Sequence, residues 1–341
     1  MKGLFRIPTA SPARVFTLRE SVFAADLFIA AVSHLDFFNR LDKNPSDIDG
    51  ICALFRIKKR PADVMLTLFK AYQLIAEKNR KYYLTDVSRT YLTARSHFDL
   101  SSYVSSLKDR PISNDMCQVL REGKPANWAA AKTGKEWVAA MEDDSFAASF
   151  TAGMNSRGAY LAGGLLQAMD LSGCRRLLDI GGASGIYPAV LMQKYPGMRA
   201  AVFDKPPVDK VAVYSLKKLG VANKIEVVAG DMFKDDLPGG YDVHLISHVL
   251  HDWDEKEVWT ILMNSYKNLA PGGTVIIHDA HINRRKTGPL SIAEYSVLLM
   301  FLSEGKCYSL KEMEDALKKT GFKNIACRPT VYNRSIITGT K

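Results

Sequence analysis

A histidine and an aspartate sit where proteins with parallel sheets carry their chemistry. His251 lies in the stretch His248–Trp253, directly after the apolar run 241–247. An imidazole with an unperturbed pKa of about 6.5 suits general acid–base catalysis at neutral pH. Asp252, its neighbour, suits either orienting the ring or capping the helix that follows. We therefore predict that His251 and Asp252 are catalytic.

Carboxylates at the ends of two other apolar runs suit a nucleoside ligand. Asp204 follows such a run about twenty residues after a glycine-rich turn, a position that suits binding of both ribose hydroxyls. Farther along, Asp231 can accept a hydrogen bond from an amino group. Met232 can press on the face of a purine, and Phe233 adds apolar cover.

The stretch 176–186 reads as a buried strand, a glycine turn and the start of a helix. Gly181 and Gly182 let the backbone turn sharply and approach a ligand closely. The third glycine of a dinucleotide fingerprint is replaced by Ala183, and Asp179 would repel a pyrophosphate. A ribose clamp and a purine slot without a pyrophosphate cradle favour S-adenosylmethionine over NAD. A purely structural turn is the alternative.

Two groups of histidines suggest metal ligands, but we predict no metal. His244, His248 and His251 would converge on a helix, but the first two fall on a predicted strand or at its end. No cysteine or carboxylate completes a ligand set at a firm spacing. Within 278–281, a strand-end carboxylate lining the ligand crevice is the simpler account.

The C-terminal half alternates between strand and helix, which predicts an α/β fold with a parallel sheet covered on both faces. Predicted strands are 176–181, 199–204, 224–229, 241–247 and 273–278, with helices at 185–195, 209–219, 254–269 and 290–302. Two further strands, 322–329 and 331–338, have no helix between them. They should form an antiparallel hairpin that closes the sheet.

The N-terminal half is predicted to be mainly helical. We expect a helix over 18–40, then helices 47–54 and 61–72 and two short strands, 74–76 and 82–85, the order of a winged helix. Residues 86–150 look helical and irregular. Phe146, Phe150 and Met154 recur every four residues and share a helix face. They form either a packed core or an apolar wall over a substrate.

Composition limits the remaining function classes. The 341 residues carry a net charge of +10, which is divided evenly between the two halves. No membrane-spanning run or signal peptide is recognised, and the five scattered cysteines suggest a reducing cytoplasm. Basic residues at 58–60 and 78–81 raise the possibility of DNA binding. Helix 61–72 is mostly apolar and has little to read base edges, so a structural winged helix is favoured.

Together these motifs resemble the class I S-adenosylmethionine-dependent methyltransferases, specifically the plant-type and bacterial small-molecule O-methyltransferases. The resemblance runs from about Glu20 to Thr338. It rests on 178–185, 203–208, 230–233, 248–253 and 269–273, in this order. It implies a winged-helix dimerisation domain (1–100), a helical linker with substrate-pocket residues (101–165) and a Rossmann-like catalytic domain (166–341).

The resemblance also assigns site residues. The expected cofactor-binding residues are Asp179, Gly181, Gly182, Asp204, Asp231, Met232, Phe233 and Ser247. Those expected to bind the acceptor are Phe146, Phe150 and Met154, and His251 would be the general base. Three departures stand out. Ala183 replaces a glycine, Ser247 replaces the lysine of plant members, and the acidic residues that flank the base are missing near Cys307 and Ser296.

The predicted activity is therefore methyl transfer from S-adenosylmethionine to a hydroxyl of a small, flat, apolar molecule, with S-adenosylhomocysteine as the other product. The resemblance implies a homodimer, and the composition favours a cytoplasmic protein with neither nucleic acid nor membrane as a partner. Two alternatives remain. One is a cofactor-binding member with lost or altered chemistry, which the missing acidic residues suggest. The other is a DNA-binding regulator, which the basic residues at 58–60 suggest.

Overall fold

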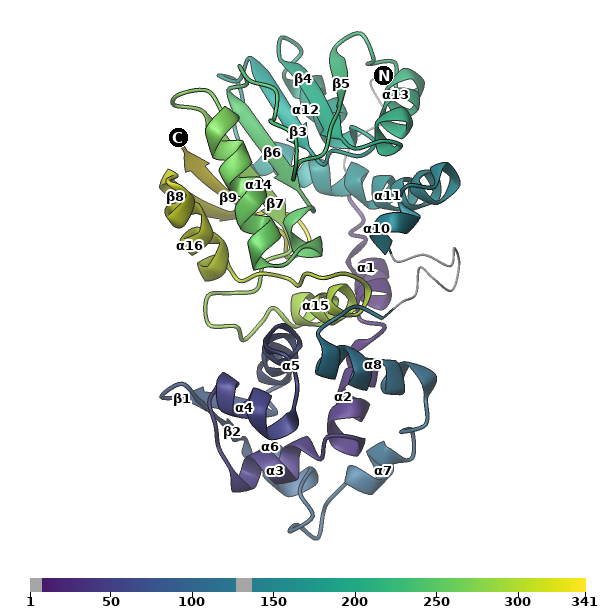
Figure 1. Cartoon of the computed structure of the whole chain (residues 1–341), viewed down its shortest axis with the longest axis vertical. Helices are drawn as coiled ribbons and strands as arrows, with labels where there is room; N and C mark the ends of the chain where they lie inside the picture. Colours follow the sequence, from purple (N-terminus) through teal and green to yellow (C-terminus); the bar gives the residue numbers. More distant parts are fainter. Residues whose placement is uncertain (1–7, 127–136) are drawn as a thin grey trace. The chain divides into compact units, whose positions relative to one another are not determined.

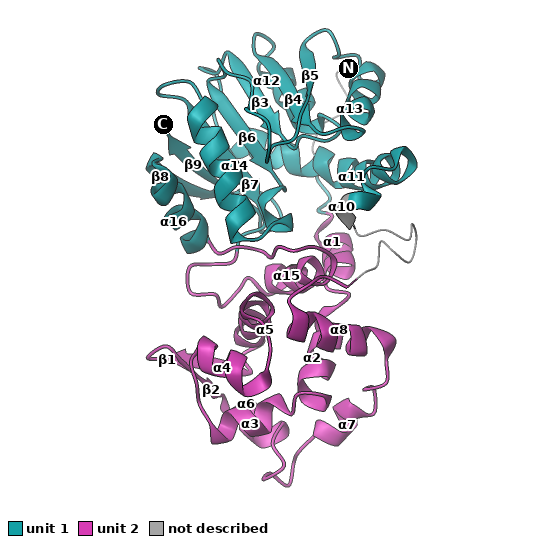
Figure 2. Ribbon diagram, in the orientation of Figure 1, with its two compact units in different colours: residues 1–11, 127–281, 310–341 teal, residues 12–126, 282–309 magenta. Residues whose placement is uncertain are grey.

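The computed structural model describes residues 8–126 and 137–341 (Figure 1). The chain divides into two compact units (Figure 2). The sheet unit comprises 1–11, 127–281 and 310–341, and the helical unit comprises 12–126 and 282–309. The division into three segments stays a prediction. In the described ranges, every helix is too short or too polar to cross a bilayer.

A seven-stranded sheet forms the centre of the sheet unit, in the order β5-β4-β3-β6-β7-β9-β8. Its strands are β3 (Arg176–Ile180), β4 (Arg199–Asp204), β5 (Ile225–Ala229), β6 (Val243–Ser247), β7 (Thr274–Asp279), β8 (Lys323–Pro329) and β9 (Ser335–Thr340). Strands β3 to β7 run parallel, and β9 pairs antiparallel with β7 and β8. This confirms the parallel sheet and its C-terminal hairpin, although β9 begins later than predicted.

The sheet is covered on both faces, which is why its central strands are apolar throughout. On one face Leu177, Val202 and Leu245 pack with α11 and α12. On the other face His244 in β6 contacts α14, with its Nδ1 3.0 Å from Ser265 Oγ. The helices are α10 (Trp137–Ala140), α11 (Asp144–Ala168), α12 (Ile186–Lys194), α13 (Val208–Lys218), α14 (Glu255–Asn268) and α16 (Leu310–Thr320), with a 3₁₀ turn, η1 (Leu250–Asp252).

The predicted helices of this unit are found within two residues of their expected ends, but α16 was missed. Most of α16 is polar, and it buries only Met313, Leu317 and Thr320. A four-residue spacing of two apolar side chains was the signal that could have revealed it.

The helical unit contains short helices and a two-stranded hairpin. Its elements are α1 (Ala13–Glu20), α2 (Ala24–Ser33), α3 (Phe37–Lys43), α4 (Ile48–Phe55), α5 (Lys59–Ala71), β1 (Ile75–Lys78), β2 (Lys81–Leu84), α6 (Asp86–Tyr91), α7 (Ser101–Ser105), α8 (Pro111–Glu122) and α15 (Leu290–Leu302). The single helix predicted over 18–40 is wrong, because the chain breaks at 21–23 and again at 34–36. Asp36 has a left-handed φ of 51°, which a continuing helix does not allow.

Helix α15 belongs to the helical unit, although its sequence follows the fifth strand of the sheet. Nearly all of its residues from Ile292 to Phe301 are buried. The helix is apolar on all of its faces because it is packed on several sides. Arg60 donates to the carbonyl oxygens of Gly305 (2.6 Å) and Gly123 (2.9 Å). Arg60, in the first turn of α5, is thus committed within the unit.

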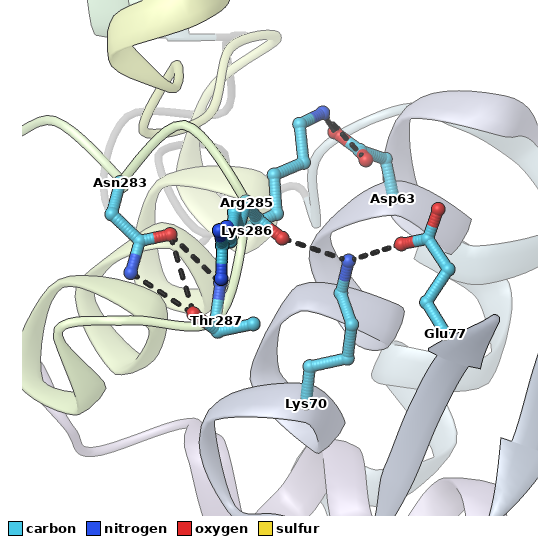
Figure 3. A network of polar contacts seen from close by, with 7 residues as sticks. All are labelled: Asp63, Lys70, Glu77, Asn283, Arg285, Lys286 and Thr287. Carbon is cyan, nitrogen blue, oxygen red and sulfur yellow. Dashed lines mark hydrogen bonds and ion pairs between the residues drawn. The ribbon is translucent and has the colours of Figure 1, made fainter. Parts of the chain in front are cut away.

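A network of ion pairs ties the segment 282–309 to α5 (Figure 3). Asp63 of α5 accepts from Lys286 at 2.7 Å and from Lys306 at 2.6 Å. Lys70 donates to Glu77 at 2.7 Å and to the carbonyl of Arg285 at 3.2 Å. The Asp63 side chain is only 15 % exposed, so it neutralises two lysines away from bulk water.

Replacing Asp63 with Asn should lower the free energy of unfolding by about 2–4 kcal/mol, because Lys286 and Lys306 would lose their shared anion in a largely buried place. Asp49→Asn is the matched control. Its pair with Lys59 is exposed at the surface, so about 0–1 kcal/mol is expected. Urea unfolding of the full chain measures both. A loss for Asp63→Asn no larger than the control's would contradict the importance of this network.

Stability should also depend on pH through His244. Burial lowers the pKa of His244 from 6.5 to about 4. The unfolded chain therefore takes up this proton first, and the contribution of the neutral ring is complete above pH 6.5 and is lost as pH falls towards 4. The stability difference between wild type and His244→Asn should shrink by about 3 kcal/mol across this window. Urea unfolding at a series of pH values tests this, with exposed His97→Asn as control, and a constant difference would refute it.

Candidate functional site

A cavity of about 560 Å³ opens at the carboxyl ends of the parallel strands of the sheet unit. The end of each of four strands contributes to its lining. The contributing residues are Gly181, Gly182 and Ala183 after β3, Asp204 and Lys205 at β4, Asp231, Met232 and Phe233 after β5, and Ser247, His248 and Val249 at β6. This is where the sheet topology predicts a ligand.

The turn after β3 has room only for glycine at two positions. Gly181 has φ +66°, and a Cβ there would lie 2.9 Å from Val249 Cγ2. A Cβ on Gly182 would lie 2.5 Å from Asp179 Oδ2. The next residue, Ala183, adopts a left-handed φ of 47° despite its side chain. The bare backbone of the two glycines is therefore what the cavity presents at this strand end.

Asp179 lies beneath this turn and does not line the cavity. Its side chain is fully buried, and neither carboxylate oxygen has a hydrogen-bond partner in the described part of the chain. Burial, and then the negative charge of Asp204, raise the pKa of Asp179 well above its ordinary value. Both effects favour the neutral, protonated form of this carboxyl group, which can donate a hydrogen bond.

Asp204 joins the glycine turn to the end of β4. Its Oδ2 accepts from Ala183 N at 2.9 Å and its Oδ1 from Lys205 N at 2.8 Å. Burial raises the pKa of Asp204 to about 6, although the two backbone hydrogen bonds oppose the shift. The group is therefore mainly ionised at neutral pH and lines the cavity as an oriented carboxylate.

The end of β5 adds a polar and aromatic wall. Asp231 Oδ1 accepts from Phe233 N at 2.9 Å, which fixes the turn. The ring of Phe233 lies 4.6 Å from that of Trp253, in an edge-on arrangement. Trp253 lines the cavity as well, a role the sequence reasoning missed. Its place next to Asp252 was the available signal.

Helix α11 forms the apolar side of the cavity. Phe150 and Met154 line it, whereas Phe146 does not. Phe146 stacks on Phe150 at 6.5 Å between ring centres and packs near Met141. Arg157, three residues after Met154, lines the same cavity and was not anticipated. The helical spacing of three residues would have placed it there.

A buried carboxylate organises the histidines beside the cavity. Asp279, the last residue of β7, has its Oδ1 2.5 Å from His251 Nδ1 and 2.7 Å from Ala280 N. Burial alone would raise the pKa of Asp279. The neighbouring His251 and His248 instead hold it well below its ordinary value. The acidic residues that are missing near Cys307 and Ser296 therefore do not leave His251 without an acidic partner, because Asp279 supplies one.

His251 lies behind the residues that line the cavity, and it is 2 % exposed. Asp252 does line the cavity, with its Oδ2 3.8 Å from His251 Nε2. Asp252 is not the cap of α14. Asp254 takes that role, accepting from Lys256 N at 2.8 Å.

The other histidines separate as their strand positions dictate. His244 points to α14, while His248 and His251 converge on Asp279. The ligand atoms of these last three residues lie within 4.8 Å of one another, a spacing that a metal ion could bridge. Hydrogen bonding to Asp279 Oδ1 already accounts for the arrangement of His251. His278 bonds Tyr187 and Thr330 instead.

Comparisons with known proteins show relatives that cover most of the chain. A family model described as an O-methyltransferase domain matches residues 114–323. The chain is 28% identical over 295 residues to a 3-hydroxy-5-methyl-1-naphthoate 3-O-methyltransferase of Streptomyces sahachiroi, covering 86% of this chain and 84% of the relative. It is 26% identical over 306 residues to acetylserotonin O-methyltransferase of Gallus gallus, covering 87% and 88% of the two chains.

A solved structure is also similar over nearly the full length. It is an O-methyltransferase family 2 protein from Planctomyces limnophilus in complex with apigenin, with a TM-score of 0.89, 30% identity and coverage of 99% of this chain and 98% of that one. The match spans both compact units. The chain thus belongs to the O-methyltransferase family, whose members take their methyl group from S-adenosylmethionine.

Proposed function

We propose that this enzyme methylates a hydroxyl group of a small aromatic molecule, with His251 as the general base. The observation that carries this proposal is the close pairing of His251 with Asp279 directly behind His248 and Asp252, which line the strand-end cavity. The named relative methylates a hydroxynaphthoate, and the solved relative holds apigenin. Both compounds are hydroxylated aromatics, so they support the same class of acceptor here.

Residues in and beneath the cavity lining suit the different parts of S-adenosylmethionine. Gly181 and Gly182 leave room for close approach of its methionine part, and Asp179 beneath them has unsatisfied oxygens. Asp204 would hold the ribose hydroxyls as an ionised acceptor. Among the described lining residues Arg157 is the sole arginine, and it suits the cofactor's carboxylate.

The adenine end would lie against the wall formed after β5. Asp231 is positioned to accept from an amino group, and Met232 and Phe233 offer apolar surface. Ser247, where plant members have lysine, contributes a hydroxyl rather than a charge. When bound, the cofactor supplies an activated methyl group on a sulfonium, so aligning the acceptor oxygen is the main task left to the protein.

The hydrogen bond to Asp279 defines the tautomer of neutral His251. Asp279 is ionised and can only accept, so the shared proton resides on His251 Nδ1. The lone pair is then on Nε2, which can take the proton of the acceptor hydroxyl. Asp279 and the nearby Asp252 both stabilise the resulting imidazolium.

Phe150 and Met154 would wall a flat acceptor, with Phe146 supporting Phe150 from behind. The two alternative functions gain no support from the described residues. A member with lost or altered chemistry was suggested by the missing acidic residues, but Asp279 provides an acidic partner for His251. Arg60 and Lys59 are engaged by carbonyl oxygens and by Asp49, which weakens the case for DNA binding.

We also propose that the helical unit, whose α4, α5 and β1–β2 hairpin follow the order of a winged helix, forms a homodimer. It carries a large number of exposed apolar side chains, among them Val15, Leu18, Phe98, Tyr103 and Leu107. Exposed apolar side chains mark an association surface where they form one contiguous patch. The five cysteines are scattered along the sequence and none forms a C-x-x-C pair, which supports a reducing, cytoplasmic setting.

Replacing His251 with Ala should lower kcat by about 10²–10⁴-fold, because general-base catalysis is lost. The dissociation constant of S-adenosylmethionine should stay unchanged, since the ring does not line the cavity. Methyl transfer from labelled cofactor to a panel of phenols, combined with calorimetry, measures both quantities. Full turnover by the variant would remove His251 from the mechanism.

Replacing Asp204 with Asn should weaken S-adenosylmethionine binding by about 10–100-fold, because hydrogen bonds from the ribose to a charged acceptor are lost. Asp236→Asn is the matched control, since its pair with Lys267 lies at the surface. Calorimetry on both variants tests the assignment. Equal affinity of Asp204→Asn and the control would refute the ribose contact.

A further inference from the structure

His248 stands out among the buried histidines by its backbone. It follows β6 directly and has a left-handed φ of 54°, which residues other than glycine rarely adopt. Its N–H donates to the carbonyl of His278 at 3.0 Å, so this conformation is held by β7. Such backbone strain persists where the surrounding structure enforces it, and it gathers at functional sites.

Its ring is buried without a hydrogen bond. The side chain is 6 % exposed, and neither Nδ1 nor Nε2 has a hydrogen-bond partner among the described residues. His244, His278 and His281, by contrast, each have a hydroxyl within 3.1 Å of a ring nitrogen. A buried ring that lacks hydrogen bonds is costly unless a ligand provides them.

The ring is directed to the reacting region. His248 lines the cavity, whereas His251 does not. The two rings lie 5.4 Å apart, and His248 Nδ1 is 3.4 Å from the Asp279 oxygen that His251 also contacts. That oxygen already accepts from His251 and Ala280. His248 thus stands next to the proposed base with hydrogen-bonding capacity to spare.

The charge state of His248 limits the kinds of chemical group that its ring can bind. Burial, and then the positive charge of Arg157, lower the pKa of His248 well below its ordinary value. The ring is therefore neutral at physiological pH, with one donor and one acceptor nitrogen. A neutral imidazole suits a hydroxyl or carbonyl group.

We propose that His248 hydrogen-bonds a second oxygen of the acceptor, adjacent to the hydroxyl that is methylated. This rests on the proposed function of the same site. The oxygen that is methylated would lie beside His251, and the oxygen on the next ring carbon would bind His248. Both imidazoles lie next to Asp279. The preferred acceptors would then be vicinal aromatic diols or ortho-hydroxycarbonyl compounds rather than isolated phenols.

The test compares 2,3-dihydroxynaphthalene with 2-naphthol, a pair that differs by a single hydroxyl. Wild type should show a kcat/KM about 10–100-fold higher for the diol, the range expected for pairing a buried polar group. His248→Leu should bring the ratio close to one through a loss on the diol alone. His248→Asn, which keeps a donor and an acceptor, should restore part of the preference and also serves if the leucine variant does not fold.

Three results would overturn the inference. One is a diol preference that persists in the folded His248→Leu variant. Another is equal use of both compounds by an active wild type. The third is a loss of S-adenosylmethionine affinity in His248→Leu, measured by calorimetry, because the ring would then serve the cofactor. A wild type inactive on both compounds and on the wider phenol panel would instead refute the proposed function, and the inference with it.

Discussion

The buried carboxylate of Asp279 is the charge on which the arrangement of the site depends. An anion in a place closed to water must be matched by donors or by positive charge. Here a backbone N–H and an imidazole N–H meet that need. The contact with the imidazole also sets the tautomer and orientation of His251. A single desolvated group thus determines the orientation and tautomer of the side chain that we propose as the base.

Much of the sheet unit could be predicted because its signals are local. Apolar runs a few residues long marked each parallel strand, and the glycine turn after β3 followed from residue types alone. Strand-end positions then followed from the rule that parallel strands finish on one edge. That is why the strand-end residues Asp204 and Asp231 could be predicted, and both line the cavity.

What was missed depends on contacts between distant residues. The partner of His251 lies 28 residues away in the chain, and periodicity carries no information about that pairing. The resemblance placed the acidic partners near Cys307 and Ser296, which contact each other in the helical unit. The breaks in the helix predicted over 18–40 could not be predicted for a similar reason, because a run of apolar residues does not indicate where the chain turns.

The path of the chain between the two units limits how this enzyme can be divided. The segment 282–309 leaves the sheet unit three residues after Asp279 and returns just before α16. A fragment that begins after residue 126 would retain α15 but lack α5, the helix to which the ion pairs bind this segment. The apolar side chains of α15 that normally face α5 would then be exposed to solvent, which would promote aggregation. A chimaera that exchanges the sheet unit between relatives would therefore have to exchange both units together, or join the chains at both ends of the segment 282–309.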